Sequence, residues 1–160
     1  MASIQNVLTA VDFSEHSLKA AQQAISVAAA TGSALELIHV VSLPGHLDPY
    51  AHLGVQATEQ HVTLADYARE QAEREMGEFL AELSATAAAH DVRVQTSIRF
   101  GQPAETVIAR AAELSAPLLV VGTHGRSGIA HMLLGSVAER LVRMSEAPVL
   151  VVPPPEHAAD

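Results

Sequence analysis

Three glycines and a serine near the C-terminus have the types and spacing of a phosphate-binding loop. The pattern is Gly122, two residues, Gly125, nine residues, and then Gly135 and Ser136. It follows an apolar, strand-like run and leads into a run with helical periodicity. Because glycine weakens both helices and strands, these glycines favour a turn whose backbone N–H groups approach a ligand closely. The first N–H groups of the helix that follows would also attract an anion.

This spacing resembles the nucleotide-binding signature of the universal stress protein family, in its ATP-binding branch. The family pattern is Gly, two residues, Gly, nine residues, Gly and then Ser or Thr, and the chain matches it at every fixed position. The resemblance covers nearly the whole chain, because it also takes in the segments Ala10–Ser14, Leu37–Val41, Gly101–Pro103 and Pro148–Val152.

The resemblance implies contact positions outside the loop. Ala10 and Val40 would line the base and ribose, and Val121 occupies a further contact position. It also favours a ligand contact for Asp12, whose carboxylate could accept hydrogen bonds from an adenine edge or a ribose. From the sequence alone, Asp12 is equally well explained as an acid at a helix start. The predicted ATP-binding residues are Ala10, Asp12, Val40, Val121, Gly122, Gly125, Arg126, Gly135, Ser136 and Val137.

Two members of this set have a second explanation. Arg126 lies inside the glycine loop and could neutralise phosphate charge, but a solvated loop arginine fits equally well. Ser136 and Glu139 have the spacing of a capping box, in which Ser136 would only satisfy the N-terminus of its own helix. A capping box leaves Gly122 and Gly125 unexplained, so the combination favours a phosphate site.

No residue is predicted to be catalytic. The sequence contains neither the P-loop lysine motif nor a dinucleotide fingerprint, and no water-activating carboxylate is evident near the glycines. His39 is predicted to be a packed residue at a strand end, and His124 a loop residue without a catalytic role. His46, Asp48 and His52 match no known metal-site spacing. Magnesium is expected only through the phosphates of the nucleotide.

Composition narrows the class of protein. The chain has 160 residues, 49% of them hydrophobic, and a formal net charge of −9. The acidic balance argues against a nucleic acid partner. No apolar run approaches the ~20 residues of a membrane helix, and no export signal is visible. The absence of cysteine excludes thiolate chemistry and disulfides. The expected location is the cytoplasm.

Hydrophobic patterns predict five strands that alternate with helices, which is typical of a doubly wound α/β domain with a parallel sheet. The expected strands are residues 4–11, 34–41, 92–98, 118–121 and 149–152, and the expected helices include 59–90 and one capped by Ser14 and Gly32. Residues 1–155 are expected to form one domain, followed by a loose tail, 156–160. The irregular segment 42–58 is expected to order over the ligand.

The family resemblance implies the strand order 3-2-1-4-5. This order agrees with the alternating pattern of residues 92–98, which is typical of an edge strand. It places the switch point between strands one and four, where parallel sheets bind ligands. Asp12 and Gly122 follow these two strands and are therefore expected to meet.

The leading hypothesis is an ATP-binding universal stress protein that acts as a regulatory module with little or no turnover. A slow ATPase or nucleotidyl transferase that uses the same crevice is one alternative, and a ligand-free dimeric interaction protein is another. The apolar edge strand Val149–Val152 predicts a homodimer, because such an edge tends to be paired or covered.

Overall fold

The structure is a computed structural model that describes residues 3–51, 62–115, 117–125 and 134–154. In chain order its elements are β1 (Asn6–Ala10), α1 (Glu15–Thr31), β2 (Ala34–Val41), α2 (Leu64–Ala89), β3 (Val94–Phe100), α3 (Pro103–Glu113), β4 (Pro117–Gly122), α4 (Ser136–Met144) and β5 (Val149–Val152). Arg126, the segment 52–61 and the predicted tail 156–160 lie outside the described residues.

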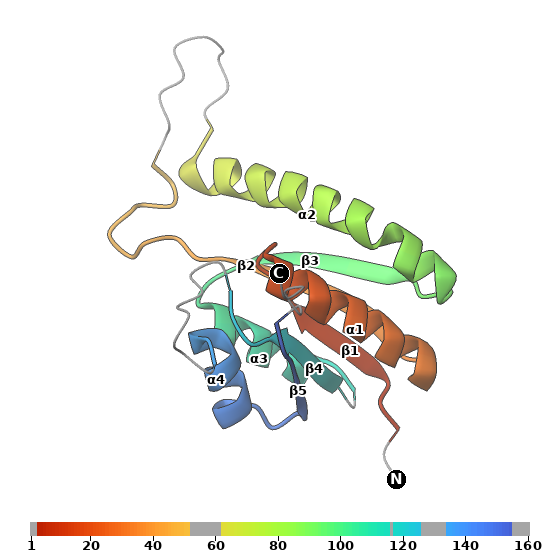
Figure 1. The fold of residues 1–160 in the computed structure, drawn as a ribbon. Coiled ribbons are helices and arrows are strands. Elements are labelled where there is room, and N and C mark those ends of the chain that lie inside the picture. The colour runs from red at the N-terminus through yellow and green to blue at the C-terminus, as the bar shows by residue number, and fades with distance from the viewer. Residues whose placement is uncertain (1–2, 52–61, 116, 126–133, 155–160) are drawn as a thin grey trace, which may run out of the picture.

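All five strands form one parallel sheet in the order β3-β2-β1-β4-β5. The predicted fold class and strand order are confirmed, including the edge position of β3. Helices α1 and α2 cover one face of the sheet, and α3 and α4 cover the other (Figure 1). Because β1 and β4 are neighbours whose helices leave toward opposite faces, their carboxyl ends flank the switch point.

The helix boundaries follow local capping signals. Ser14 accepts a hydrogen bond from the backbone N–H of Ser17 at the start of α1, and Gly32 ends this helix in the left-handed conformation at φ 67°. Helix α2 begins at Leu64, and Val62 and Thr63 before it are not helical, so the predicted helix 59–90 starts later than expected. Thr63 caps α2 through a reciprocal capping box with Asp66. These hydrogen bonds set the first residue of the helix, which the spacing of hydrophobic residues alone does not locate.

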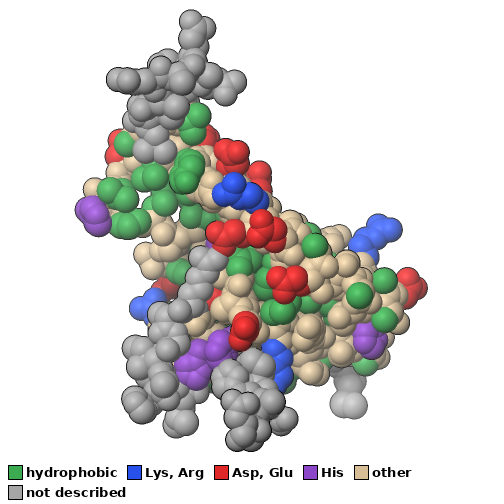
Figure 2. Space-filling view, turned by 45° about the horizontal axis from the view of Figure 1, so that its top comes forward, with side chains coloured by type: hydrophobic (Ala, Val, Ile, Leu, Met, Phe, Trp, Pro, Cys, Tyr) green, Lys and Arg blue, Asp and Glu red, His purple; other side chains and the backbone are tan. Residues whose placement is uncertain are grey.

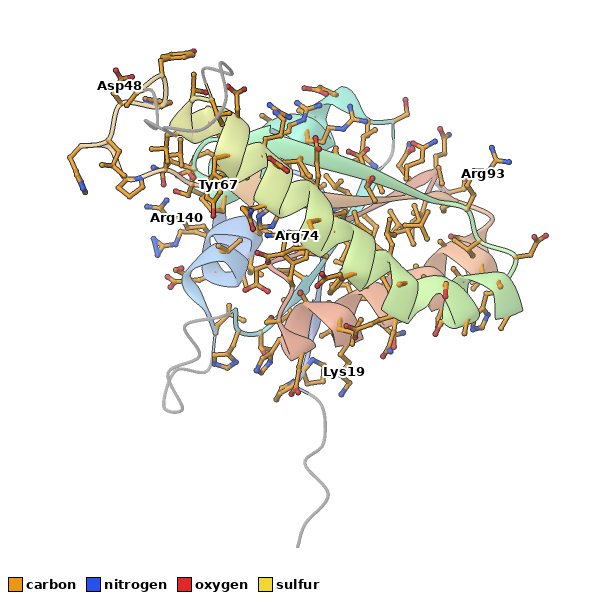
Figure 3. The ribbon with its side chains drawn as sticks, turned by 90° about the horizontal axis from the view of Figure 1, so that it is seen from above. Lys19, Asp48, Tyr67, Arg74, Arg93 and Arg140 are labelled. Atoms are coloured by element: carbon orange, nitrogen blue, oxygen red, sulfur yellow. The ribbon has the colours of Figure 1, made fainter. Side chains whose placement is uncertain are left out.

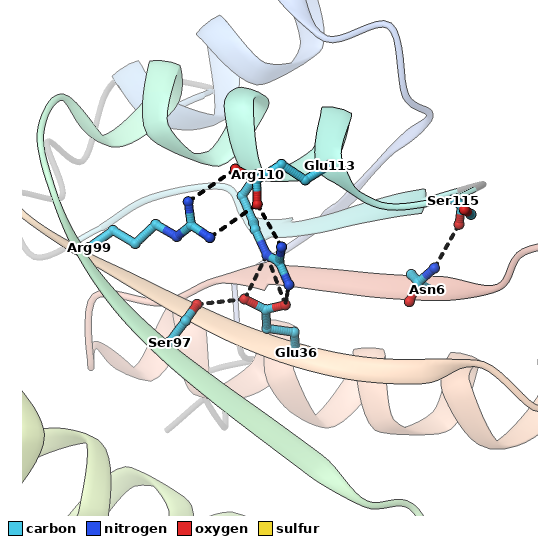
Figure 4. A network of polar contacts seen from close by, with 7 residues as sticks. All are labelled: Asn6, Glu36, Ser97, Arg99, Arg110, Glu113 and Ser115. Carbon is cyan, nitrogen blue, oxygen red and sulfur yellow. Dashed lines mark hydrogen bonds and ion pairs between the residues drawn. The ribbon is translucent and has the colours of Figure 1, made fainter.

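A network of polar side chains joins helix α3 to strands β2 and β3 (Figure 4). The Arg110 guanidinium bonds both carboxylate oxygens of Glu36 on β2, with Nη2 2.7 Å from Oε2. Ser97 on β3 donates to Glu36 Oε1 at 2.6 Å. Glu113 receives bonds from both Arg110 and Arg99. Glu36 is only 8% exposed, so this network supplies the charge partners that burial of its carboxylate requires.

The segment between β2 and α2 is tied to the start of α2 in its described part. The Leu64 N–H donates to the carbonyl of Ala51 at 3.0 Å, and the Ala65 N–H donates to the carbonyl of Pro49 at 2.9 Å. Tyr50 N–H donates to the Asp48 carboxylate at 2.9 Å. None of residues 42–51 lines the pocket described below, and the ordering of this segment over a ligand stays a prediction. No helix in the described segments is long and apolar enough to cross a membrane.

Candidate functional site

A pocket of about 320 Å³ lies at the carboxyl ends of β1, β2 and β4. Its volume is at the lower end of the range for small-ligand sites. Nine of the ten predicted binding residues line it, and the tenth, Arg126, lies outside the described residues. The nine are Ala10, Asp12, Val40, Val121, Gly122, Gly125, Gly135, Ser136 and Val137. Segments that are more than a hundred residues apart in the sequence therefore meet at one place.

Gly122 ends β4 and allows α1 to lie directly against it. A Cβ at this position would come within 2.9 Å of the backbone oxygen of His16 in the first turn of α1. Real side chains do not tolerate this distance, and a helix backbone cannot easily withdraw. The absence of a side chain at Gly122 is therefore explained by helix packing, whereas the sequence interpretation assigned it to ligand approach or to a tight turn.

Gly125 lies against the carboxylate of Asp12. A Cβ at Gly125 would meet Asp12 Oδ2 far inside normal contact distance. The other oxygen, Oδ1, accepts hydrogen bonds from the Ser14 hydroxyl at 2.6 Å and from the Ser14 N–H at 3.1 Å. Asp12 therefore supports the start of α1 and also lines the pocket. The expected meeting of Asp12 with the glycine loop is confirmed, because β1 and β4 bring Asp12 and Gly122 to the same pocket.

Gly135 holds the start of α4 against the loop after β4. Its N–H donates to the carbonyl of Thr123, and a Cβ here would lie 3.0 Å from that same oxygen. Its φ of −71° is open to any residue, so the need for glycine comes from this close approach and not from the turn conformation. Thr123 N–H in turn donates to the carbonyl of Val152 at 3.1 Å, which ties the loop to β5.

The N-terminus of α4 opens into the pocket without a side-chain cap. Gly135 is the N-cap residue, Ser136 is the first residue of the helix, and the described residues supply no side-chain cap at this helix start. The capping-box explanation of Ser136 is therefore wrong. Ser136, Val137 and Ala138, which carry those first amides, all line the pocket. Together with the helix dipole, three amides without helical partners form a place for an anion.

The turn between β1 and α1 is shaped by Phe13. This residue has a positive φ of 66°, which is rare and costly for a bulky side chain. Its ring stacks on His39 at a centroid distance of 4.3 Å and meets Phe79 edge-on at 5.7 Å. His39 Nδ1 lies 2.8 Å from the carbonyl oxygen of Val11. These contacts pack His39 at the end of β2 and hold the turn that carries Asp12, and His39 also lines the pocket.

The remaining wall of the pocket is apolar and was missed in part by sequence reasoning. Pro103 and Val107 reach it from α3, and Ile38 reaches it from β2. The apolar residues at helical spacing in α3 were a signal for this wall. The connection from β3 to β4 runs across the sheet in the direction opposite to that from β1 to β2, so a right-handed crossover packs α3 on the face opposite α1. The pocket therefore combines an apolar slot, suited to a flat ring, with a polar end at Asp12 and the start of α4.

His124 lies in the loop after β4 and its side chain is beside the site. It lines the pocket, its Nδ1 lies 3.1 Å from the Thr123 hydroxyl, and its ring centroid is 5.5 Å from that of His16. In the described segments, no group of three or more histidine and acidic side chains has the geometry of a metal site. Among the described lining residues there is also no lysine or arginine.

Comparison with known proteins places this chain in a family. The universal stress protein family model matches residues 3–153. Universal stress protein MJ0531 of Methanocaldococcus jannaschii is 30% identical over 152 residues, which cover 95% of this chain and 84% of the relative. The structure of UspA from Lactobacillus plantarum has a TM-score of 0.72 at 20% identity, and the match covers 95% of this chain and 99% of that one.

Two similar structures are nucleotide complexes. A universal stress protein in complex with cAMP is 27% identical, with a TM-score of 0.63 and coverage of 94% of this chain and 98% of that one. The Archaeoglobus fulgidus protein in complex with dAMP has 17% identity and a TM-score of 0.60, with coverage of 94% and 98%. The fold, the family model and the relatives agree, and the chain belongs to the universal stress protein family.

Proposed function

We propose that this chain binds ATP in the pocket between Asp12 and the start of α4, and that the nucleotide regulates it with little or no turnover. The observation that carries the proposal is the open N-terminus of α4. Gly135 draws it against the loop after β4, and its first amides line the same pocket as the apolar slot. A base in the slot and phosphates at the helix start would use both halves of the pocket.

The comparisons support adenine as the base. One similar structure holds cAMP and another holds dAMP, so two relatives of the same fold bind adenine nucleotides. Arg126 and a magnesium ion held by the phosphates are proposed to balance the charge of the triphosphate, since the described lining residues supply an aspartate and no lysine or arginine. The predicted cytoplasmic location stays a prediction.

A slow ATPase is the second candidate, and the position of Asp12 favours it. Its carboxylate lies beside Gly125, where it could orient a water molecule near the phosphates. We still expect turnover far below ~1 per second, because Asp12 Oδ1 already accepts two hydrogen bonds from Ser14. Calorimetric titration with ATP, with and without magnesium, combined with phosphate release, separates the candidates. Binding without release supports the regulatory module, whereas rapid release that saturates with ATP supports the enzyme.

We also propose that two copies pair through β5. This strand lies at the sheet edge, and three of its four residues are half-buried although all are apolar. Val142 and Met144 on the neighbouring helix α4 are 52% and 54% exposed. Two β5 edges running antiparallel would satisfy their free backbone groups around a two-fold axis.

Light scattering is expected to give twice the chain mass of 16.8 kDa. Val151→Lys is expected to shift the protein toward monomer, because it places a charge on the paired edge. Melting of the variant serves as a control for folding, since Val151 also packs on the core beneath α3 and α4. A wild-type protein that remains monomeric at tens of micromolar would rule out the pairing.

A further inference from the structure

A second hollow lies at the same end of the sheet as the nucleotide pocket, but on the opposite face. It has a volume of about 550 Å³ and lies between the carboxyl ends of β2 and β3, the 43–50 loop and the first turns of α2. Val40 lines the first pocket and Val41 lines the second, and no described residue lines both. The two sites are therefore separate, with the end of β2 between them.

The walls of this hollow are fixed by backbone hydrogen bonds. Pro49 and Ala51 accept bonds from the first N–H groups of α2, so the loop wall is attached to the helix wall. On the other side, the Gly101 N–H donates to the carbonyl of Val41 at 3.1 Å and joins the ends of β2 and β3. Gly101 has φ +145°, and a Cβ there would lie 2.6 Å from the Thr106 hydroxyl, so glycine is required at this turn.

The hollow combines a cation with apolar and aromatic surface. The Arg69 guanidinium carbon lies 5.0 Å from the centroid of the Phe100 ring, in cation–π geometry. Leu43 and Pro49 add apolar surface, and Tyr50 is 76% exposed at the rim. Figure 2 shows hydrophobic side chains gathered at this end of the molecule, next to the grey segment. Together these residues give the hollow a contiguous apolar and aromatic wall on which a ligand ring can pack.

Arg69 has no anionic partner in the part of the chain that the structure describes. By contrast, four other arginines pair with glutamates, namely Arg99, Arg110, Arg140 and Arg143. Asp66 also lines the hollow, but Thr63 holds its Oδ2 through two hydrogen bonds in the capping box. A guanidinium that is positioned by a ring and has its donors available suits a carboxylate, which it binds through two parallel hydrogen bonds.

We propose that this hollow is a second ligand site, which takes a small aromatic carboxylic acid. The carboxylate pairs with Arg69, and the ring of the ligand packs on Phe100, Tyr50 and the apolar loop wall. Asp66 beside the site disfavours ligands with two negative charges, so a monocarboxylate is preferred over a phosphate. This site does not depend on nucleotide binding in the first pocket.

The test uses 2-naphthoate as the probe, with the neutral 2-naphthamide as its matched control. Naphthoate is expected to bind the full-length protein with one-to-one stoichiometry and a Kd below about 1 mM. Arg69→Gln is expected to weaken naphthoate about tenfold and to leave naphthamide unchanged, because only the charged probe uses the guanidinium. Phe100→Leu is expected to weaken both probes several-fold.

Arg93→Gln is the matched control variant. Arg93 is an exposed arginine at the end of the molecule opposite Asp48 and the 42–51 loop (Figure 3). The Arg93→Gln protein should therefore bind naphthoate like wild type. Amide chemical shifts recorded during the naphthoate titration locate the bound probe, and we expect changes at Tyr50 and Gly101. Equal binding by wild type and Arg69→Gln, full displacement of naphthoate by ATP, or absence of saturable binding would each overturn the proposal.

Discussion

Arg110→Met is expected to lower the free energy of unfolding by about 3 kcal/mol at pH 7, because it leaves the Glu36 carboxylate without its partner. Glu36 is 8% exposed and can recruit little water in place of the lost bonds. For a chain of this length, the melting temperature should fall by roughly 6 to 12 °C. The chain offers a matched control in Arg140→Met, which removes an exposed pair with Glu105 and should cost less than about 1 kcal/mol.

The same network predicts a pH dependence. Burial by itself raises the pKa of Glu36, but the hydrogen bonds from Arg110 and Ser97 outweigh it, so this pKa lies below its usual value. A lowered pKa in the folded state stabilises the protein fully above the ordinary glutamate pKa of about 4.3. This contribution is lost as the pH falls through the folded-state pKa.

The difference in stability between wild type and Arg110→Met should therefore shrink as the pH falls below about 4.3. Denaturant unfolding of both proteins at several pH values measures this difference in the free energy of unfolding. The double variant with Glu36→Gln should be more stable than Arg110→Met alone, because it removes the unpaired charge. A difference that stays constant down to acid pH would show that Glu36 and Arg110 are not coupled in this way.

Gly125→Val is expected to weaken ATP binding by at least about 100-fold, equivalent to 2.7 kcal/mol. The new side chain would displace the Asp12 carboxylate and fill the space in which the loop meets the ligand. The fold should persist, because the atom it meets is the end of a side chain. Wild type with ATP at 100 times its Kd should melt roughly 5 to 10 °C higher, and Gly125→Val should lose this shift.

Two other glycines separate binding from folding. Gly122→Ala would meet the backbone of His16 and is expected to destabilise the protein even without nucleotide. Gly77→Ala lies in α2 with nothing within 4 Å of its Cβ, and should leave the ATP shift intact. If Gly125→Val retained the full ATP shift, the glycine loop would not be the nucleotide site.

The strands and their order followed closely from the sequence, and nine of the ten predicted binding residues line one pocket. The β2 span Ala34–Val41 and the β5 span Val149–Val152 agree with their predicted ranges, because continuous apolar runs between turn residues leave little freedom. The strand order came from the family resemblance and was confirmed. Sequence reasoning did less well where one residue decides the outcome, as at the α4 cap, which is Gly135 and not Ser136.

What the sequence could not predict depends on contacts between distant segments. The need for glycine at Gly122 arises from the path of α1, and nothing in the loop itself reveals it. The charge within the apolar run of β2 was a visible signal that Glu36 needs a partner. That partner, Arg110, is 74 residues away and is identified only by the packing of α3 on the sheet.

A nucleotide whose phosphates lie at the open start of α4 must perturb the first amides of this helix. An amide NMR titration of the full-length protein with ATP detects this contact residue by residue. We expect saturable shifts at Ser136, Val137 and Ala138, together with Gly125, while the amides near the C-terminal end of α2 stay unchanged. Saturable ATP binding that leaves the α4 amides unshifted, or no binding with and without magnesium, would contradict this proposal.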